Sequence, residues 1–191
     1  MVDLTSRMAP YFDGHLLLPL LDSLRESGLQ DAQTITKEKI AILGKTNMVD
    51  VMCDEYERPE CAAEIKAVFK AEKAAIDKRK EDIFAVLDNE PEVVKEVGAF
   101  FANKELVFEL KSSGGLNVEK LAADHGITND KLTAYYKNGK FKYDCGMYDQ
   151  AEEMLTSYLT VQQTPANIRL GALWGRLACR ILQAKWDETM G

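Results

Sequence analysis

Apolar residues recur along this chain at intervals of three and four positions, the spacing that places side chains on one face of an α-helix. Three well-separated stretches share this pattern: Leu17, Leu20, Leu21 and Leu24; Val93, Val94, Val97, Phe100 and Phe101; and Leu170, Leu173, Trp174, Leu177 and Ile181. No segment shows the sustained alternation of apolar and polar residues that predicts a β-strand. The sequence therefore predicts an all-α fold.

One helix is expected to be much longer than the others. Residues 60–89 contain neither glycine nor proline, and at 3.6 residues per turn they make roughly eight turns. A single apolar face runs through their dense mixture of charges, marked by Ile65, Phe69, Ile76, Ile83 and Leu87. The heptad spacing of some of these residues admits a short coiled-coil contact, but Glu72 and Arg79 fall where apolar partners would lie. The pattern favours a solvated helix with one buried stripe.

A short segment near the C-terminus repeats an earlier one. Residues 145–151 return loosely as residues 183–189, so that Trp186 follows Tyr148 by 38 positions. In both copies a small residue precedes an aromatic one by two positions, and an acid follows. Such a period is typical of stacked helical hairpins, in which a tight turn is followed by an aromatic side chain that anchors the second helix. Because the second copy stops at Gly191, we expect this polypeptide to be part of a longer protein.

These patterns predict two regions. Residues 1–115 are expected to form irregular helical hairpins that include the long helix near 60–89, and residues 116–191 a TPR- or HEAT-like α-solenoid that is incomplete at its C-terminus. The expected structural anchors of the repeats are Gly146, Tyr148, Ala151, Trp174 and Trp186. The glycine should occupy the turn between two helices, and Tyr148 should pack on the helix before it. Trp174 should be largely buried between the last two regular helices.

Composition and charge narrow the function classes. The chain has 191 residues, of which 46% are hydrophobic and 29% charged, and a formal net charge of −7, which argues against a free-standing nucleic-acid binder. Its four cysteines form no C-x-x-C pair and it has only two histidines, so no metal site is predicted. We find no catalytic set of residues, cofactor motif, secretory signal or membrane-spanning run. These features favour a non-catalytic cytoplasmic protein without a cofactor or a membrane partner.

One cluster of residues is a candidate contact for RNA or for a partner protein. Tyr136 with Lys137, Lys140 and Lys142 combines aromatic and basic side chains, which together bind single-stranded nucleic acid when they are exposed. The other interpretation is that the rings of this region form the core of a hairpin while the lysines are solvated. Both interpretations remain open on the sequence alone.

Several short segments carry a resemblance to a known family. They are Leu4–Arg7, His15–Leu21, Thr46–Asp50, Leu121–Gly126, Lys140–Tyr148, Leu173–Ala178, Ile181–Leu182 and Trp186–Asp187. Together, and in family order, they resemble the N-terminal region of the e-subunit family of eukaryotic translation initiation factor three. The resemblance extends over almost all 191 residues, and residues 62–88 match least, in helical character alone.

The resemblance implies a non-catalytic scaffold subunit of a PCI complex. Members of the family continue into further helices and a winged-helix PCI module, before which this chain stops. The implied partners are the other subunits of initiation factor three, initiation factor four G and the small ribosomal subunit during mRNA recruitment. The implied location is the cytoplasm, with the nucleus as a second location. The alternatives are the equivalent subunit of the proteasome lid or the COP9 signalosome, and an RNA-contacting helical module.

Overall fold

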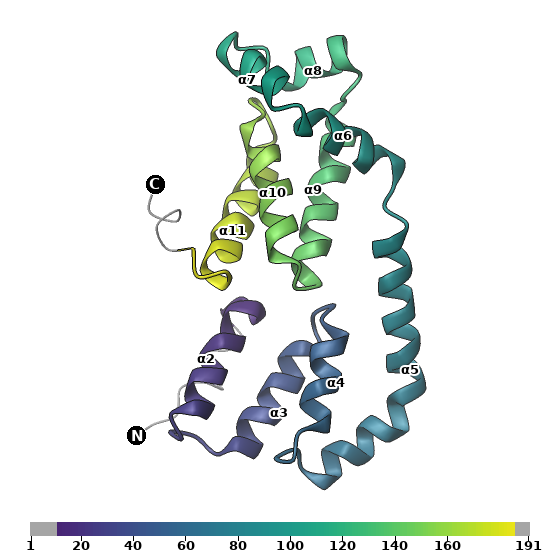
Figure 1. Ribbon diagram of the computed structural model, residues 1–191, viewed down its shortest axis with the longest axis vertical. Coiled ribbons are helices and arrows are strands. Elements are labelled where there is room, and N and C mark those ends of the chain that lie inside the picture. Colours follow the sequence, from purple (N-terminus) through teal and green to yellow (C-terminus); the bar gives the residue numbers. More distant parts are fainter. Residues whose placement is uncertain (1–10, 186–191) are drawn as a thin grey trace. The chain divides into compact units, whose positions relative to one another are not determined.

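The computed structural model describes residues 11–185 (Figure 1). Within them it has ten helices: α2 (Gly14–Glu26), α3 (Ala32–Leu43), α4 (Val49–Glu57), α5 (Ala63–Asp88), α6 (Glu92–Ala102), α7 (Lys104–Ser112), α8 (Val118–His125), α9 (Asn129–Asp144), α10 (Tyr148–Thr160) and α11 (Ala166–Leu182). These described residues contain no strand, only an isolated β-bridge between Asn117 and Gln162. The prediction of an all-α fold is confirmed. The solenoid geometry stays a prediction.

The chain divides into two compact units, Met1–Asp88 and Asn89–Gly191. The division falls at the C-terminal end of α5, and each unit has a hydrophobic core of its own. The predicted change from irregular hairpins to regular repeats at residue 116 lies within the second unit. That change in repeat type stays a prediction.

In the first unit α2 packs on α3, α3 on α4 and α4 on α5 (Figure 1). Asp13 and Asp31 begin α2 and α3, because their carboxylates accept hydrogen bonds from backbone N–H groups of the first turn. The rings of Tyr56 and Phe69 stack with their centroids 4.3 Å apart and join α4 to α5. The buried core comprises Leu18, Leu43, Val49, Met52, Tyr56, Cys61 and Ile76.

The long helix expected near residues 60–89 is α5, and most of its surface faces solvent. Of its 26 residues only Ile76 is buried. Arg79 fastens the helix to the loop after α3 by donating hydrogen bonds to the carbonyl oxygens of Gly44 and Thr46. The helix thus has one narrow buried stripe, and most of its remaining residues are exposed.

In the second unit α9 and α10 form a hairpin, α11 packs on both, and α6 packs on α9 (Figure 1). Asn117 and Thr128 begin α8 and α9 with side-chain oxygens that accept backbone hydrogen bonds. By contrast α7 has no buried residue, and its Phe108 is 72% exposed. The core comprises Val94, Val97, Phe101, Leu116, Leu121, Ile127, Leu132, Tyr135, Met154, Leu155, Tyr158, Leu159, Val161 and Ala172.

Small residues let α9, α10 and α11 approach one another closely. A β-carbon added at Gly175 of α11 would lie 2.8 Å from Leu155 Cδ1, and one added at Gly139 of α9 would lie 3.2 Å from Met154 Cβ. Both distances are shorter than ordinary contacts between carbon atoms. The buried face of α11 is made of equally small side chains, those of Ala172, Ala178 and Cys179.

The prediction that Trp174 is largely buried is wrong, because the residue is 54% exposed. The orientation of α11 explains the difference. Helical periodicity places Trp174 on the side of α11 opposite Ala172 and Cys179, which are fully buried against the neighbouring helices. The small side chains face inward and permit the close approach, and the large apolar side chains are therefore left outward. Residue size, not hydrophobicity, decides which face of this helix is buried.

Candidate interaction surface

The four residues of the predicted contact all lie on α9, but the structure does not bring them to one surface. Lys137 and Lys140 are exposed. Among residues 11–185 neither ammonium group has a hydrogen-bond or ion-pair partner. Lys142 lies on the opposite side of the helix, since positions two or five residues apart do not share a helical face. The two free lysines and Lys142 therefore meet different surroundings.

Lys142 is engaged with its neighbours. Its Nζ lies 3.2 Å from a carboxylate oxygen of Glu90 and donates a hydrogen bond of 2.9 Å to Oε1 of Gln150. All three residues line a groove of about 380 Å³. An ammonium group held in this way is not free to bind phosphate, so Lys142 does not belong to the same contact as Lys137 and Lys140.

The groove beside Lys142 is lined by several titratable side chains. Its walls carry charges of both signs, and Glu90 is paired with Lys142. Burial raises the pKa of Tyr135, which lines the groove, to about 12 in spite of a hydrogen bond with Ser157. Its hydroxyl therefore stays protonated at neutral pH. None of the nine lining residues is a cysteine, serine, threonine or histidine.

Tyr136 packs at the junction of three helices. Its ring centroid lies 5.4 Å from that of Tyr158 on α10. Its hydroxyl lies against Gly171 of α11, where a β-carbon would collide with it. The residue is half-buried. Its main role is therefore in packing, and only part of its ring is accessible to a partner.

The predicted turn residues lie between α9 and α10. Gly146 has a φ of 78°, a left-handed conformation that favours glycine. Tyr148 is the first residue of α10, and its ring centroid lies 5.6 Å from that of Tyr143 on α9. Ala151 follows in α10 and is fully buried. The glycine thus reverses the chain, and the tyrosine packs back on the preceding helix, as the sequence predicts.

The turn after α11 repeats the turn after α9, hydrogen bond for hydrogen bond. After α9 three backbone N–H groups donate to three carbonyl oxygens: Cys145 to Phe141, Gly146 to Tyr143 and Met147 to Lys142. After α11 the same bonds recur 38 positions later: Gln183 to Cys179, Ala184 to Ile181 and Lys185 to Arg180. The φ of Ala184 is 55°, also left-handed. The same three bonds also follow α7, where Ser113, Gly114 and Gly115 donate to Glu109, Lys111 and Leu110, so this turn geometry is not confined to positions 38 residues apart. Trp186, the predicted counterpart of Tyr148, lies outside the described residues.

Glu152 at the start of α10 holds the end of α11. Its carboxylate accepts hydrogen bonds from Arg180 Nε at 2.8 Å, from Lys185 Nζ at 2.9 Å and from Gln183 Nε2 at 3.1 Å. Burial alone would raise the pKa of this carboxyl, but the hydrogen bonds from Arg180 and Lys185 outweigh burial and hold the pKa below its ordinary value. The carboxylate therefore stays charged and fixes the repeated turn.

The outward face of α11 is an apolar stripe. Four large side chains at helical spacing make it up: Leu170 (69% exposed), Leu173 (40%), Trp174 (54%) and Leu177 (36%). The helix also contains three arginines and no acidic residue. An apolar stripe of this kind, bordered by charge, is typical of a protein interaction site.

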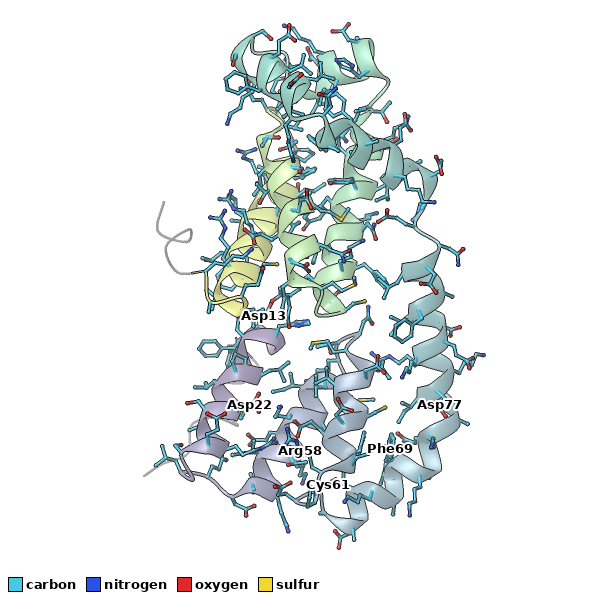
Figure 2. All side chains as sticks on the ribbon, in the orientation of Figure 1. Asp13, Asp22, Arg58, Cys61, Phe69 and Asp77 are labelled. Carbon is cyan, nitrogen blue, oxygen red and sulfur yellow. The ribbon has the colours of Figure 1, made fainter. Side chains whose placement is uncertain are left out.

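A second buried carboxylate joins three helices of the first unit. Glu55 of α4 accepts a hydrogen bond of 2.8 Å from Arg25 of α2 and lies 2.7 Å from Nζ of Lys39 on α3. Asp22 and Arg58, both labelled in Figure 2, complete the cluster through contacts with Lys39 and Glu55. Burial alone would raise the pKa of Glu55, but hydrogen bonds from Arg25 and Lys39 outweigh it and hold the pKa below its ordinary value.

Sequence reasoning missed both carboxylates. Glu55 meets Arg25 across 30 positions, and Glu152 meets Arg180 across 28. No helical spacing connects residues so far apart, so only the packing of the helices brings them together. Gly171 and Gly175 did carry a signal, because two glycines four positions apart in an apolar helix mark a face of close approach.

Across residues 11–185 no group of three or more histidine, cysteine, aspartate and glutamate side chains is placed to hold a metal ion. In the same part of the chain no helix is both long and apolar enough to cross a membrane.

Comparison with known proteins finds relatives that match nearly the whole sequence. Three of them are named as the E subunit of eukaryotic translation initiation factor 3. The identities are 33% over 190 residues for Arabidopsis thaliana, 32% over 192 residues for Brugia malayi and 32% over 191 residues for Caenorhabditis elegans. Each match covers 98% of this chain, and 41%, 41% and 42% of the respective relative. The chain thus spans about two fifths of the length of the curated relatives that it matches.

A family match agrees with these relatives. Residues 3–142 match the family described as the eIF3 subunit 6 N terminal domain. The matched stretch includes the Glu55 cluster, the long helix α5 and α9 as far as Lys142. Because the match extends over most of the sequence, the chain belongs to the eIF3 subunit 6 N terminal domain family.

Proposed function

We propose that the chain is a non-catalytic scaffold component of translation initiation factor three and presents helical surfaces to other subunits of that complex. The observation that carries the proposal is the match of 98% of the chain to proteins named as the E subunit of this factor. The family match over residues 3–142 supports the same assignment.

The helices supply surfaces of the kind that a scaffold needs. Only Ile76 of α5 is buried, α7 has no buried residue, and α11 presents an apolar stripe to solvent. Long exposed helical faces bind partners along their length, whereas an enzyme encloses its substrate in a cleft. The buried carboxylates Glu55 and Glu152 hold these helices in fixed positions within each unit.

The proposal extends to the wider partners of initiation. Initiation factor four G and the small ribosomal subunit are the further partners, and mRNA recruitment is the step in which the scaffold acts. The cytoplasm is the place of this activity, with the nucleus as a second location. A direct contact with RNA through Lys137 and Lys140 is a weaker alternative, because Lys142 is paired with Glu90.

Affinity purification tests the proposal. The chain, tagged at one end, is expressed in its own cells, and the proteins that copurify are identified by mass spectrometry beside a tag-only control. We expect the other subunits of initiation factor three to be enriched. Enrichment of proteasome-lid or signalosome subunits in their place would assign the chain to a sister complex, and enrichment of neither set would contradict a scaffold role.

A further inference from the structure

The helices α9 and α11 run side by side in the same direction. Contacts at two heights along the helices fix this arrangement. At the first height, Tyr136 of α9 contacts Tyr158 of α10 and Gly171 of α11. About one turn further on, Leu155 of α10 lies close to Gly139 of α9 and Gly175 of α11. Residue numbers rise in the same direction along α9 and along α11. The two helices are therefore parallel and in register.

This register brings charged and apolar side chains to one surface. Lys140 lies one turn beyond Tyr136 on the same side of α9, and Trp174 lies nearly one turn beyond Gly171 on the adjoining side of α11. Lys140 and Trp174 are both exposed. With one exposed neighbour each they form what we call the α9–α11 surface: Lys137, Lys140, Leu170 and Trp174.

We infer that the α9–α11 surface binds an acidic protein segment that carries large apolar side chains. Charge complementarity is the first reason. The two lysines have no partner among residues 11–185, although the whole chain has a net charge of −7. The basic character is thus local, and it attracts an acidic partner to this face.

The apolar edge of the surface is the second reason. Trp174 and Leu170 are 54% and 69% exposed, and tryptophan is enriched among the residues that contribute most to binding at protein interfaces. A partner with apolar side chains between its acids would bury both residues while its carboxylates meet Lys137 and Lys140. The inference names the chemistry of one contact of the proposed scaffold, and it rests on that proposed function.

RNA fits this surface less well than protein does. A single-stranded RNA site needs several rings for base stacking and a continuous row of basic groups. Of the residues expected to form one, Lys142 is paired with Glu90, and the ring of Tyr136 packs on Tyr158. Leu170 offers no face for stacking. The observations therefore favour a protein segment.

Tryptophan fluorescence tests the inference on the full chain. The chain has two tryptophans, so the variant Trp186→Phe leaves Trp174 as the emitting residue. The probe is an amphipathic helical peptide of about 18 residues, with leucines on one face and glutamates beside them. We expect a saturable shift of Trp174 emission to shorter wavelength as the indole leaves water. A twin peptide with lysine at every glutamate position should bind about tenfold more weakly or not at all.

Matched variants distinguish peptide binding at the α9–α11 surface from nonspecific binding. In the same Trp186→Phe background, Lys137→Glu with Lys140→Glu should weaken binding of the acidic peptide about tenfold or more. Lys104→Glu with Lys111→Glu, on exposed positions of α7, should leave it unchanged. For the apolar edge, Leu170→Ser should weaken binding, whereas Phe108→Ser, also on exposed α7, should not.

Three results would overturn the inference. They are no emission shift with the acidic peptide, equal binding of the two peptides, and tighter binding of a uridine oligonucleotide than of the acidic peptide. The last result would assign the surface to RNA. Each failure is distinguishable from failure of the proposed function, because copurification of initiation factor three subunits with the wild-type chain does not depend on the peptide titration.

Discussion

Glu55 is a buried carboxylate, which needs cationic partners to remain charged. It is 2% exposed, and it is surrounded by the cationic groups of Arg25, Lys39 and Arg58. A buried ion pair contributes little net stability compared with an apolar pair, but removing one partner leaves the other charge buried and uncompensated. Lys39, which is 4% exposed, would keep only its contact with the carboxylate of Asp22, which is 44% exposed.

Replacing Glu55 by glutamine should therefore destabilise the first unit. The amide keeps the size of the side chain but removes the charge that Arg25 and Lys39 share, so we expect a loss of about 3 kcal/mol in the free energy of unfolding at neutral pH. Urea unfolding followed by circular dichroism measures it. Asp50→Asn is the matched control on the same helix, because Asp50 is half exposed in its pair with Lys80, and it should change stability little.

The pH dependence of Glu55→Gln provides an independent check. The pKa of Glu55 is lower in the folded chain than its ordinary value of 4.5. Its contribution to stability is therefore fully present above pH 4.5 and disappears as the pH falls through the folded-state pKa. The stability difference between the wild type and Glu55→Gln should be constant from neutral pH down to about 4.5 and should shrink below it. A difference that grows in acid would contradict this account.

Residues differ in how far the sequence alone reveals them. The turn at Gly146 could be predicted, because a small residue before an aromatic one is a local signal and the turn itself is local. Glu55 could not, because its partners lie on two other helices. The exposure of Trp174 could not be predicted, since both faces of α11 are apolar and only the packing distances show which one is close to α10.

The two faces of α11 differ in the size and the exposure of their side chains. Gly171, Ala172 and Gly175 form a face of small residues toward α9 and α10, and large apolar side chains lie on the other. A helix normally buries its bulkiest apolar face. Here the closeness of the neighbouring helices excludes bulky side chains from the buried face. Helix positions could be predicted from periodicity, whereas this rotation of α11 could not.

Adding a methyl group on the small face should be unfavourable. In Gly175→Ala the new β-carbon would lie 2.8 Å from Cδ1 of Leu155, which is 1% exposed and has little room to move. We expect a loss of about 1–3 kcal/mol, in spite of the higher helix propensity of alanine. Urea unfolding of the full chain measures the change.

Gly98→Ala is the matched control for Gly175→Ala. Gly98 also lies within a helix of the second unit, but an added β-carbon there would meet nothing closer than Cε2 of Tyr135 at 3.8 Å, an ordinary contact distance. Alanine should therefore raise the stability by up to about 1 kcal/mol. If both substitutions stabilised the chain equally, the close approach of α11 to α10 would not be a constraint on its sequence.

The molecule as a whole consists of two units with separate cores. The core of the first unit draws on residues between Leu18 and Ile76, and that of the second on residues between Val94 and Ala172. Each unit also has its own buried carboxylate, Glu55 in the first and Glu152 in the second. Periodicity along the sequence predicts helices but not which of them share a core, so the division at Asp88 was not evident before the structure.

Separate cores predict separate local unfolding. Hydrogen exchange reports the opening of each region, and a residue that supports one core should change protection mainly in its own unit. Glu55→Gln should speed exchange in α2, α3 and α4 and leave α9, α10 and α11 as protected as in the wild type. Gly175→Ala should have the reverse effect. The measurement is hydrogen–deuterium exchange with mass spectrometry on the full chain, and faster exchange throughout the chain in either variant would show that the two units unfold as one.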